Sequence, residues 1–343
     1  MTARRSNPHP WLDAEREALN QALEDNRLGH APMFLGSPGV GKRMLAEWLV
    51  RRILCLDPSG GEPCGACRAC TLIDSGAHPD LFRLQLLEDK SEILVDQVRD
   101  FVASLTLTPS VGSRRIGMIV PADRLNRNAA NALLKTLEEP SSGVWLALVT
   151  DNEDRLPVTV TSRCQRRYVA VPDRSTALDW LCQRHGDRDR GECELALDLA
   201  DGAPLLADEW LSGVGLELGL AIRDGLAGVI SGRADESALV AQWRETPAES
   251  WRWLARFSQL WLHGVLAAPP GVLADAPMPG KGPGAGAVLE QCWKQALEGR
   301  RLAGRPVRHD WLMQSWLTEW RKLSHGRAGH FSGDLARFSG TLE

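Results

Sequence analysis

A glycine-rich loop constrains the fold of this chain more than any other feature of its sequence. Residues 36–42 read Gly-Ser-Pro-Gly-Val-Gly-Lys, which is the pattern G-x4-G-K. The loop follows the apolar run Met33–Leu35 and precedes Met44–Ile53, which has a helical pattern. In such a strand–loop–helix unit the glycines let backbone N–H groups face a phosphate at the start of the helix. The sequence therefore predicts a phosphate-binding loop (P-loop) in an α/β domain.

The candidate nucleotide-binding residues are Gly36, Gly39 and Gly41, which shape the loop, and Lys42, which would supply a positive charge. The next position, where a hydroxyl should ligate magnesium, is Arg43. An arginine side chain offers only donors and cannot hold a cation. The sequence leaves open whether ATP occupies this degenerate loop, since Arg43 could itself offset phosphate charge.

Hydrolysis also requires acidic groups at the end of a neighbouring strand, where they orient magnesium and the attacking water. The apolar run Ile116–Val120 is the candidate strand, and Val120 and Pro121 stand where these acids belong. Asp123 lies three residues past the strand end and is expected to cap or hydrogen-bond locally rather than hold metal. We therefore expect no ATP hydrolysis at this chain's own loop.

Four cysteines form a second candidate site. Cys55, Cys64, Cys67 and Cys70 have the spacing C-x8-C-x2-C-x2-C. Four thiolates close a tetrahedron around zinc, which is typical of a structural rather than a catalytic metal. A reducing compartment disfavours disulfides, and the C-x3-C-P run of ferredoxin-type iron–sulfur proteins is absent. The spacing predicts a structural zinc module at about residues 55–70.

The 343 residues are enough for two or three domains. From residue 31 to 171, short apolar runs (Pro32–Leu35, Arg115–Val120, Val144–Thr150) alternate with helical patterns, which favours a parallel sheet flanked by helices. After Pro172 only helical signals remain. We predict three domains, 1–171, 172–210 and 211–343.

Two details refine this division. Asn128–Leu137 places apolar residues at i, i+3, i+4 and i+7 and is stopped by Pro140, which predicts an amphipathic helix. The last domain carries most of the tryptophans, and Leu312, Trp316, Trp320 and Leu323 share one helix face, which favours a packed helical bundle over a base-stacking platform. The Gly/Pro-rich stretch 267–287 is expected to be a loop whose role the sequence does not indicate.

Charge and hydropathy exclude several classes of protein. Forty basic and forty-four acidic side chains give a net charge of −4, so no overall positive field attracts nucleic acid. No signal-peptide pattern and no apolar run of membrane-spanning length are seen. We expect a cytoplasmic protein that makes no membrane contact.

Specific motifs point to a family. Residues 129–140, Ala-Ala-Asn-Ala-Leu-Leu-Lys-Thr-Leu-Glu-Glu-Pro, and the motif Ser162-Arg163-Cys164 resemble stretches shared by the subunits of bacterial clamp loaders, which are AAA+ proteins. The four cysteines after the P-loop helix and Arg27–Ala31 resemble this family as well. The resemblance is close from about Pro10 to Tyr168, and beyond that only length and helical character agree.

Within this family, motor subunits keep the hydroxyl and the acids that this chain lacks, and they carry an arginine near Gly202–Pro204 that is absent here. The resemblance is therefore to the non-hydrolysing delta prime type. It implies an AAA+ P-loop domain with a zinc module, a small helical lid domain and a C-terminal helical collar. It also implies the partners: gamma/tau motor subunits, the delta subunit, and, through the assembly, the sliding clamp and primer–template DNA.

The resemblance assigns Arg163 a role in trans, at the γ-phosphate of ATP bound to a neighbouring motor subunit. It places the chain within the DNA polymerase III holoenzyme, a DNA-directed DNA polymerase and nucleotidyltransferase, with no polymerase or ATPase activity expected of this chain alone. Two alternatives stay open: an ATP-hydrolysing gamma/tau-like motor subunit, and a zinc-dependent regulator that binds nucleic acid. The sequence does not reveal which collar residues make contacts or how much DNA this chain touches.

Overall fold

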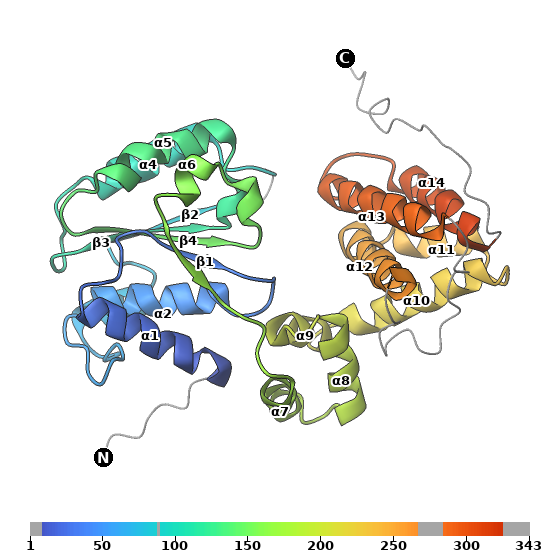
Figure 1. Cartoon of the computed structure of the whole chain (residues 1–343), viewed down its shortest axis with the longest axis horizontal. Coiled ribbons are helices and arrows are strands. Elements are labelled where there is room, and N and C mark those ends of the chain that lie inside the picture. The colour runs from blue at the N-terminus through green and yellow to red at the C-terminus, as the bar shows by residue number, and fades with distance from the viewer. Residues whose placement is uncertain (1–8, 88–89, 267–283, 325–343) are drawn as a thin grey trace. The chain divides into compact units, whose positions relative to one another are not determined.

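The computed structural model describes residues 9–87, 90–266 and 284–324. The chain divides into two compact units, Met1–Leu211 and Ser212–Glu343. The first unit contains the sheet and the P-loop, and the described part of the second is helical (Figure 1). The predicted domains 1–171 and 172–210 thus fall within one compact unit. The division into three domains, 1–171, 172–210 and 211–343, stays a prediction.

A five-stranded parallel sheet forms the centre of the first unit, in the order β2-β3-β4-β1-β5. The strands are β1 (Pro32–Leu35), β2 (Leu81–Gln85), β3 (Arg115–Val120), β4 (Val144–Thr150) and β5 (Gln165–Tyr168). The three inner strands coincide with the three apolar runs of the sequence, because strands covered on both faces require continuous apolar stretches. The two edge strands are half-exposed and left no such run. The predicted α/β class is confirmed.

Helices cover both faces of this sheet: α4, α5 and α6 lie on one face and α1 and α2 on the other (Figure 1). The helices of the first unit up to this point are α1 (Asp13–Glu24), α2 (Lys42–Leu54), α3 (Arg68–Asp74), α4 (Val95–Leu105), α5 (Arg127–Glu138) and α6 (Val158–Thr161). A buried cluster between the sheet and α4 and α5 includes Met33, Phe101, Ile119, Leu133 and Leu148. This core fixes the strand ends that carry the P-loop.

Helix α5 agrees with the helix predicted at 128–137 to within one residue at each end. It begins after Asn126, whose side chain accepts a hydrogen bond from the N–H of Ala129 at 2.8 Å, as an N-cap does. It ends before Pro140, as the restriction on residues preceding proline requires. Its apolar face is buried against the sheet: Ala130, Leu133 and Leu137, with Leu134 partly buried.

Three further helices complete the first unit: α7 (Arg174–Arg184), α8 (Arg190–Leu199) and α9 (Pro204–Leu211). Aspartates cap the first two. Asp173 accepts from the N–H of Thr176 at 3.2 Å, and Asp189 from that of Glu192 at 2.8 Å. These helices form the small helical bundle that the sequence predicted after Pro172.

The second unit is a bundle of α10 (Gly215–Ile230), α11 (Glu236–Trp243), α12 (Pro247–Leu266), α13 (Ala285–Leu302) and α14 (His309–Arg321). Six of its tryptophans are at most 1% exposed: Trp243, Trp251, Trp253, Trp261, Trp316 and Trp320. Trp316 and Trp320 stack with ring centroids 5.1 Å apart. Because these rings are packed inside the bundle, they are core residues and offer no face to a base. Of the predicted loop 267–287, residues 267–283 lie outside the described residues, and its last three belong to α13.

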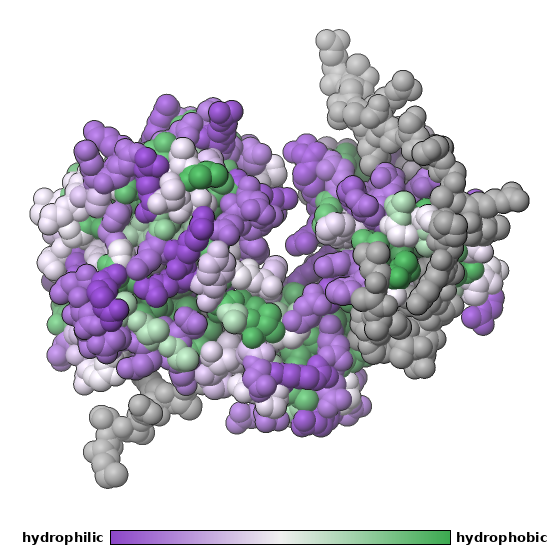
Figure 2. Space-filling model, in the orientation of Figure 1, coloured by the Kyte–Doolittle hydropathy of each residue, from purple (hydrophilic) through white to green (hydrophobic). Residues whose placement is uncertain are grey.

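The surface is mixed, with hydrophilic residues prevailing on the face in Figure 2. Large apolar side chains reach solvent singly, such as Val158 at 78% and Trp311 at 61% exposure. None of the helices in the described ranges combines the length and the apolar character that crossing a membrane requires.

The segment that follows α2 is anchored by buried polar contacts to α1 and α2. Arg52 is 9% exposed, and its guanidinium donates to the Asn20 side chain at 2.9 Å and to the Gly61 carbonyl at 3.1 Å. It also pairs with Glu24 at 3.2 Å. Trp48 Nε1 donates to Glu62 at 2.7 Å. One buried arginine thus ties two helices and the loop 55–70 together.

We expect Arg52→Met to lower the free energy of unfolding by about 2 kcal/mol, since hydrogen bonds to a charged group contribute about 1.5–3 kcal/mol and the buried Asn20 side chain loses its donor. Arg43→Met is the matched control, because Arg43 lies on the same helix but is exposed and pairs only with Glu47, four residues on. Its substitution should change stability by less than about 0.5 kcal/mol. Chemical denaturation of both variants measures the difference, and equal losses would contradict this account.

Candidate functional site

The P-loop has the backbone of a phosphate-binding loop. Gly36, Gly39 and Gly41 have φ angles of +146°, +80° and +104°, which residues with a Cβ rarely adopt. Gly41 is the N-cap of α2, so the helix begins at Lys42 as the motif predicts. The predicted glycine positions therefore do shape this loop.

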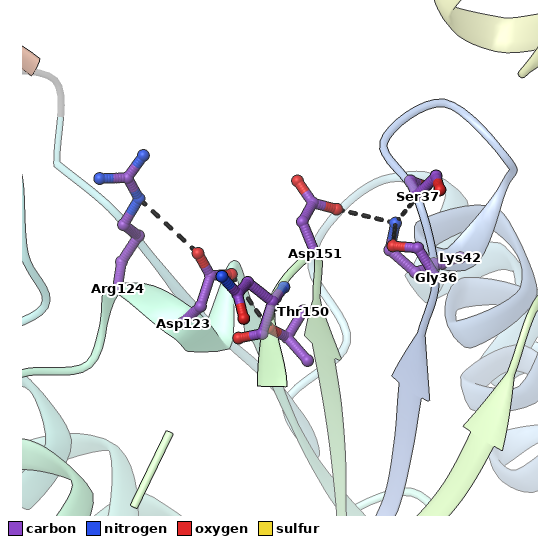
Figure 3. Close-up of polar contacts among 8 residues, drawn as sticks. Gly36, Ser37, Lys42, Asp123, Arg124, Thr150 and Asp151 are labelled. Atoms are coloured by element: carbon purple, nitrogen blue, oxygen red, sulfur yellow. Dashed lines mark hydrogen bonds and ion pairs between the residues drawn. The ribbon is translucent and has the colours of Figure 1, made fainter. Parts of the chain in front are cut away.

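Lys42 is directed inward and fully engaged by groups of its own chain (Figure 3). Its Nζ donates to the carbonyls of Gly36 at 2.8 Å and Ser37 at 2.6 Å, and forms an ion pair with Asp151 at 2.7 Å. The Lys42 side chain is 5% exposed and that of Asp151 is 50% exposed. A lysine ammonium has three N–H donors, and three acceptors are in place.

The sheet brings Asp151 to this lysine. Strands β1 and β4 are adjacent and parallel, with Leu35 paired to Thr150. The residues that follow the two strands therefore meet at the same edge of the sheet, where ligands bind in open α/β folds. Asp151 was not among the residues predicted from sequence, although its position directly after a buried apolar strand was a usable signal.

Arg43, Val120 and Pro121 stand where the sequence pattern would place magnesium ligands. Arg43 is 58% exposed and bonds Glu47 at 3.0 Å. Strand β3 ends at Val120, followed by Pro121. Among these residues none offers the oxygen that magnesium requires.

Asp123 makes a hydrogen bond, as expected, but not with its own turn. Its carboxylate accepts from Thr150 Oγ1 at 3.1 Å, across to the end of β4, and lies 4.0 Å from Arg124 (Figure 3). The expectation of a local bond was wrong in that respect. This link ties the turn after β3 to the end of β4.

Two other segments cover the P-loop. The N–H of Leu205, in α9, donates to the Gly39 carbonyl at 3.0 Å, and a Cβ at Gly39 would lie 2.5 Å from Cβ of Leu206. From the N-terminal side, Trp11 Nε1 donates to the Val40 carbonyl at 2.9 Å. These contacts join residues far apart in sequence, and no local pattern indicates them.

Trp11 also packs edge-on against Trp180 of α7, with ring centroids 5.1 Å apart. His9 lies beside both rings. Burial, together with the positive charges of Arg16 and Arg184, lowers the pKa of His9. The N-terminal segment and α7 are thus joined by aromatic contacts beside the P-loop.

The four predicted cysteines come together. The sulfur atoms of Cys55, Cys64, Cys67 and Cys70 lie within 4.8 Å of one another. The Sγ atom of Cys55 lies 3.6 Å from that of Cys64 and 3.9 Å from that of Cys67. A zinc ion with sulfur ligands at about 2.3 Å gives a tetrahedron with edges of about 3.8 Å. The cluster therefore fits a metal ion of this kind.

Backbone N–H groups turn toward the sulfurs, as they do around thiolates. The N–H of Cys64 lies 3.3 Å from Sγ of Cys55, and that of Cys67 lies 3.3 Å from Sγ of Cys64. Burial pushes the pKa of the Cys67 thiol up, but N–H groups of Cys70 and Leu56 and the neighbouring thiols outweigh it, and its pKa falls to about 6. The other shifts in the cluster have the opposite direction, because burial raises the pKa of the Cys55 thiol and raises that of the Cys70 thiol to about 12.

Arg163 lies apart from these contacts, after α6. Its guanidinium pairs with Glu138 at 2.5 Å, at the end of α5, and donates to the Thr159 carbonyl at 2.8 Å. The Arg163 side chain is 35% exposed and that of Glu138 is 48% exposed. Next to it Cys164 is largely buried, which raises the pKa of its thiol to about 11. The arginine of the Ser-Arg-Cys motif is thus held at the surface by Glu138 and the Thr159 carbonyl.

Comparison with known proteins identifies the family. Residues 13–171 match the family model described as DNA polymerase III, delta subunit. The chain is 36% identical over 240 residues to DNA polymerase III subunit delta' of Pseudomonas aeruginosa, covering 70% of this chain and 72% of that protein. With subunit delta' of Yersinia pestis it shares 33% identity over 254 residues, covering 73% and 74%. With subunit tau/gamma of Haemophilus influenzae it shares 34% identity over 176 residues, covering 50% and 25%.

A solved structure supports the fold. A DNA polymerase III gamma subunit-related protein from Thermotoga maritima superposes with a TM-score of 0.51 at 18% identity, covering 90% of this chain and 99% of that one. At this level of identity the similarity concerns the fold alone. Since two subunits delta' align over more than two thirds of their own length, this chain belongs to the delta prime family of DNA polymerase III subunits.

Proposed function

We propose that this chain is the non-hydrolysing delta prime subunit of a DNA polymerase III clamp loader and assists the opening and loading of the sliding clamp on primed DNA. The observation that carries the proposal is a P-loop with an intact backbone but without groups for magnesium, in a chain of the delta prime family. Such a subunit contributes architecture and contacts, and its neighbours contribute ATP hydrolysis.

The partners follow from the same proposal. They are the gamma/tau motor subunits and the delta subunit, with the clamp and primer–template DNA reached through the assembly. The similarity to a tau/gamma protein over half of this chain supports a shared architecture for neighbouring subunits. A net charge of −4 supports contact with DNA through the assembly rather than by this chain alone.

The motor-subunit alternative predicts ATP turnover by the isolated chain. We expect none attributable to its own loop, because Arg43, Val120 and Pro121 provide no oxygen ligand for magnesium. Steady-state ATPase measurements on the wild type and on Lys42→Ala test this. Turnover that Lys42→Ala abolishes would establish the motor alternative. Arg43→Thr should stay inactive, since the acids after β3 are still missing.

We further propose that the cysteine cluster holds one structural zinc ion. The separations of Cys55 from Cys64 and Cys67 support this, as do the N–H groups directed at the sulfurs. A zinc ion would cross-link the end of α2 to α3 and stabilise a loop too short to have a core of its own. The regulator alternative would add DNA binding at this loop, which a mobility-shift assay on the isolated chain detects.

Elemental analysis of the purified chain should give one zinc per chain. Cys67→Ser should lose most of this metal and loosen residues 55–70. The strand and helix around the P-loop should stay folded, because the core between β1 and helices α4 and α5 contains none of the four cysteines, and Lys42 at the start of α2 is held by Gly36, Ser37 and Asp151. Cys182→Ser is the control, since Cys182 lies outside the cluster, and should keep a full complement of zinc. Iron in place of zinc, or no metal at all, would contradict the proposal.

We propose that Arg163 acts in trans on ATP held by a neighbouring motor subunit. A guanidinium is always charged and binds two phosphate oxygens at once. Its present partner, Glu138, is about half exposed, and exposed pairs contribute only about 0–1 kcal/mol. The pair with Glu138 therefore costs little to exchange for a phosphate.

Arg163→Ala should leave folding, zinc content and assembly unchanged but lower the DNA- and clamp-stimulated ATP turnover of the reconstituted loader and its rate of clamp loading. Arginine fingers contribute about 10³–10⁵ in rate in GTPases, and one site among several in an assembly would show less. Arg163→Lys should restore little, since a lysine lacks the two-pronged geometry.

Arg166→Ala is the matched control for this measurement. Arg166 belongs to the same basic run, is 48% exposed and pairs with Glu153 at 3.2 Å, so its loss removes the same charge from the same surface. Loading should then proceed at the normal rate. Equal effects of the two substitutions would assign Arg163 a general electrostatic role and remove its role in trans.

A further inference from the structure

The P-loop lysine is a buried and fully paired charge at the carboxyl edge of the sheet. Lys42 is 5% exposed, and its three N–H donors meet two backbone carbonyls and the carboxylate of Asp151 at 2.6–2.8 Å. A phosphate bound by such a lysine would need one of these donors. Every donor is already taken by the chain itself.

Asp151 presents the same chemistry to Lys42 as a phosphate oxygen does. Both groups are anionic and accept hydrogen bonds without donating. Burying an ammonium without a counter-charge is costly, and a carboxylate at 2.7 Å removes that cost without any ligand. The β1–β4 register places this carboxylate directly after its strand, so no rearrangement is needed to bring it there.

Helix α9 closes the loop from a second side. The Gly39 carbonyl accepts from Leu205, and Leu206 lies so near that a Cβ at Gly39 would be 2.5 Å from its Cβ. Gly39 is thus packed directly against α9. The retained glycines, however, still give the loop the curled backbone that phosphates bind.

We propose that Asp151 is an internal substitute for phosphate that keeps the P-loop closed, and that the loop regains metal-independent binding of polyphosphate groups when this carboxylate is neutralised. The closed loop is then a structural element in the wild-type chain. This inference concerns the loop of this chain alone and does not depend on Arg163 or on assembly with other subunits.

The test is calorimetric titration of the full-length chain, without magnesium, with inorganic tripolyphosphate and separately with ATP. Asp151→Asn should bind both probes at least about tenfold more tightly than the wild type, a change of about 1.4 kcal/mol. Asp151→Asn combined with Lys42→Met should lose the gain, because the anion then has no ammonium to meet. Asp154→Asn removes an exposed carboxylate three residues further on and should bind as the wild type does.

Three results would overturn the proposal. One is a wild-type chain that already binds tripolyphosphate as tightly as Asp151→Asn. Another is a folded Asp151→Asn that gains nothing. If Asp151→Asn does not fold, Asp151→Ser is titrated in its place, and failure of both to fold would show that Asp151 holds the structure rather than closing the loop. Failure of the clamp-loader proposal would appear instead in the reconstituted assembly and leave these titrations unchanged.

Discussion

The parallel pairing of β1 with β4 is the constraint on which the rest of the first unit depends. It sets Leu35 beside Thr150, so the P-loop and the turn after β4 leave the sheet at the same point. The next strand, β3, ends at the same edge, and Asp123 is linked back to Thr150 from there. The register thus brings Lys42, Asp151 and Asp123 to one edge of the sheet, where ligands bind in open α/β folds.

The retained glycines have a steric explanation that requires no ligand. A Cβ at Gly36 would lie 2.4 Å from the Val169 carbonyl oxygen, and one at Gly39 would collide with Leu206. Both residues also have positive φ angles. Packing of β5 and α9 against the loop therefore demands glycine as strictly as phosphate does. Arg43 and Val120 make none of these contacts with the glycines. The packing therefore requires the glycines of the loop but places no constraint on the positions of the magnesium ligands.

The sequence predicted features that are local or periodic, and the structure added those that join distant segments. The inner strands and α5 were predicted closely, because full burial leaves continuous apolar runs and a helix with one covered face leaves a period of 3.6. Strands β2 and β5 were not predicted, because these edge strands are half-exposed and therefore lack a continuous apolar run. The cysteines were predicted to cluster from their spacing alone, and their sulfurs do so.

Contacts between residues far apart in sequence were not predicted. Nothing near Lys42 in sequence indicates that its partner is Asp151, or that Trp11 bonds the P-loop and packs on Trp180. Asp123 was expected to cap or hydrogen-bond locally, but its carboxylate accepts from Thr150 at the end of β4. These contacts follow from strand order and from helix docking, which a single sequence does not specify residue by residue.

Two ion pairs of the first unit, Lys42–Asp151 and Arg163–Glu138, differ in how readily they exchange partners. Lys42 is 5% exposed, so removing Asp151 from it without a replacement leaves a buried charge, which costs several kcal/mol. The side chains of Arg163 and Glu138 are 35% and 48% exposed, so water solvates both groups when the ion pair separates. Breaking this pair therefore costs about 1 kcal/mol or less. A phosphate approaching Lys42 must displace a carboxylate that the sheet register holds in place, whereas one approaching Arg163 meets a guanidinium that solvent already reaches. The same fold thus closes its own phosphate site while it leaves an arginine on the surface free to change partner.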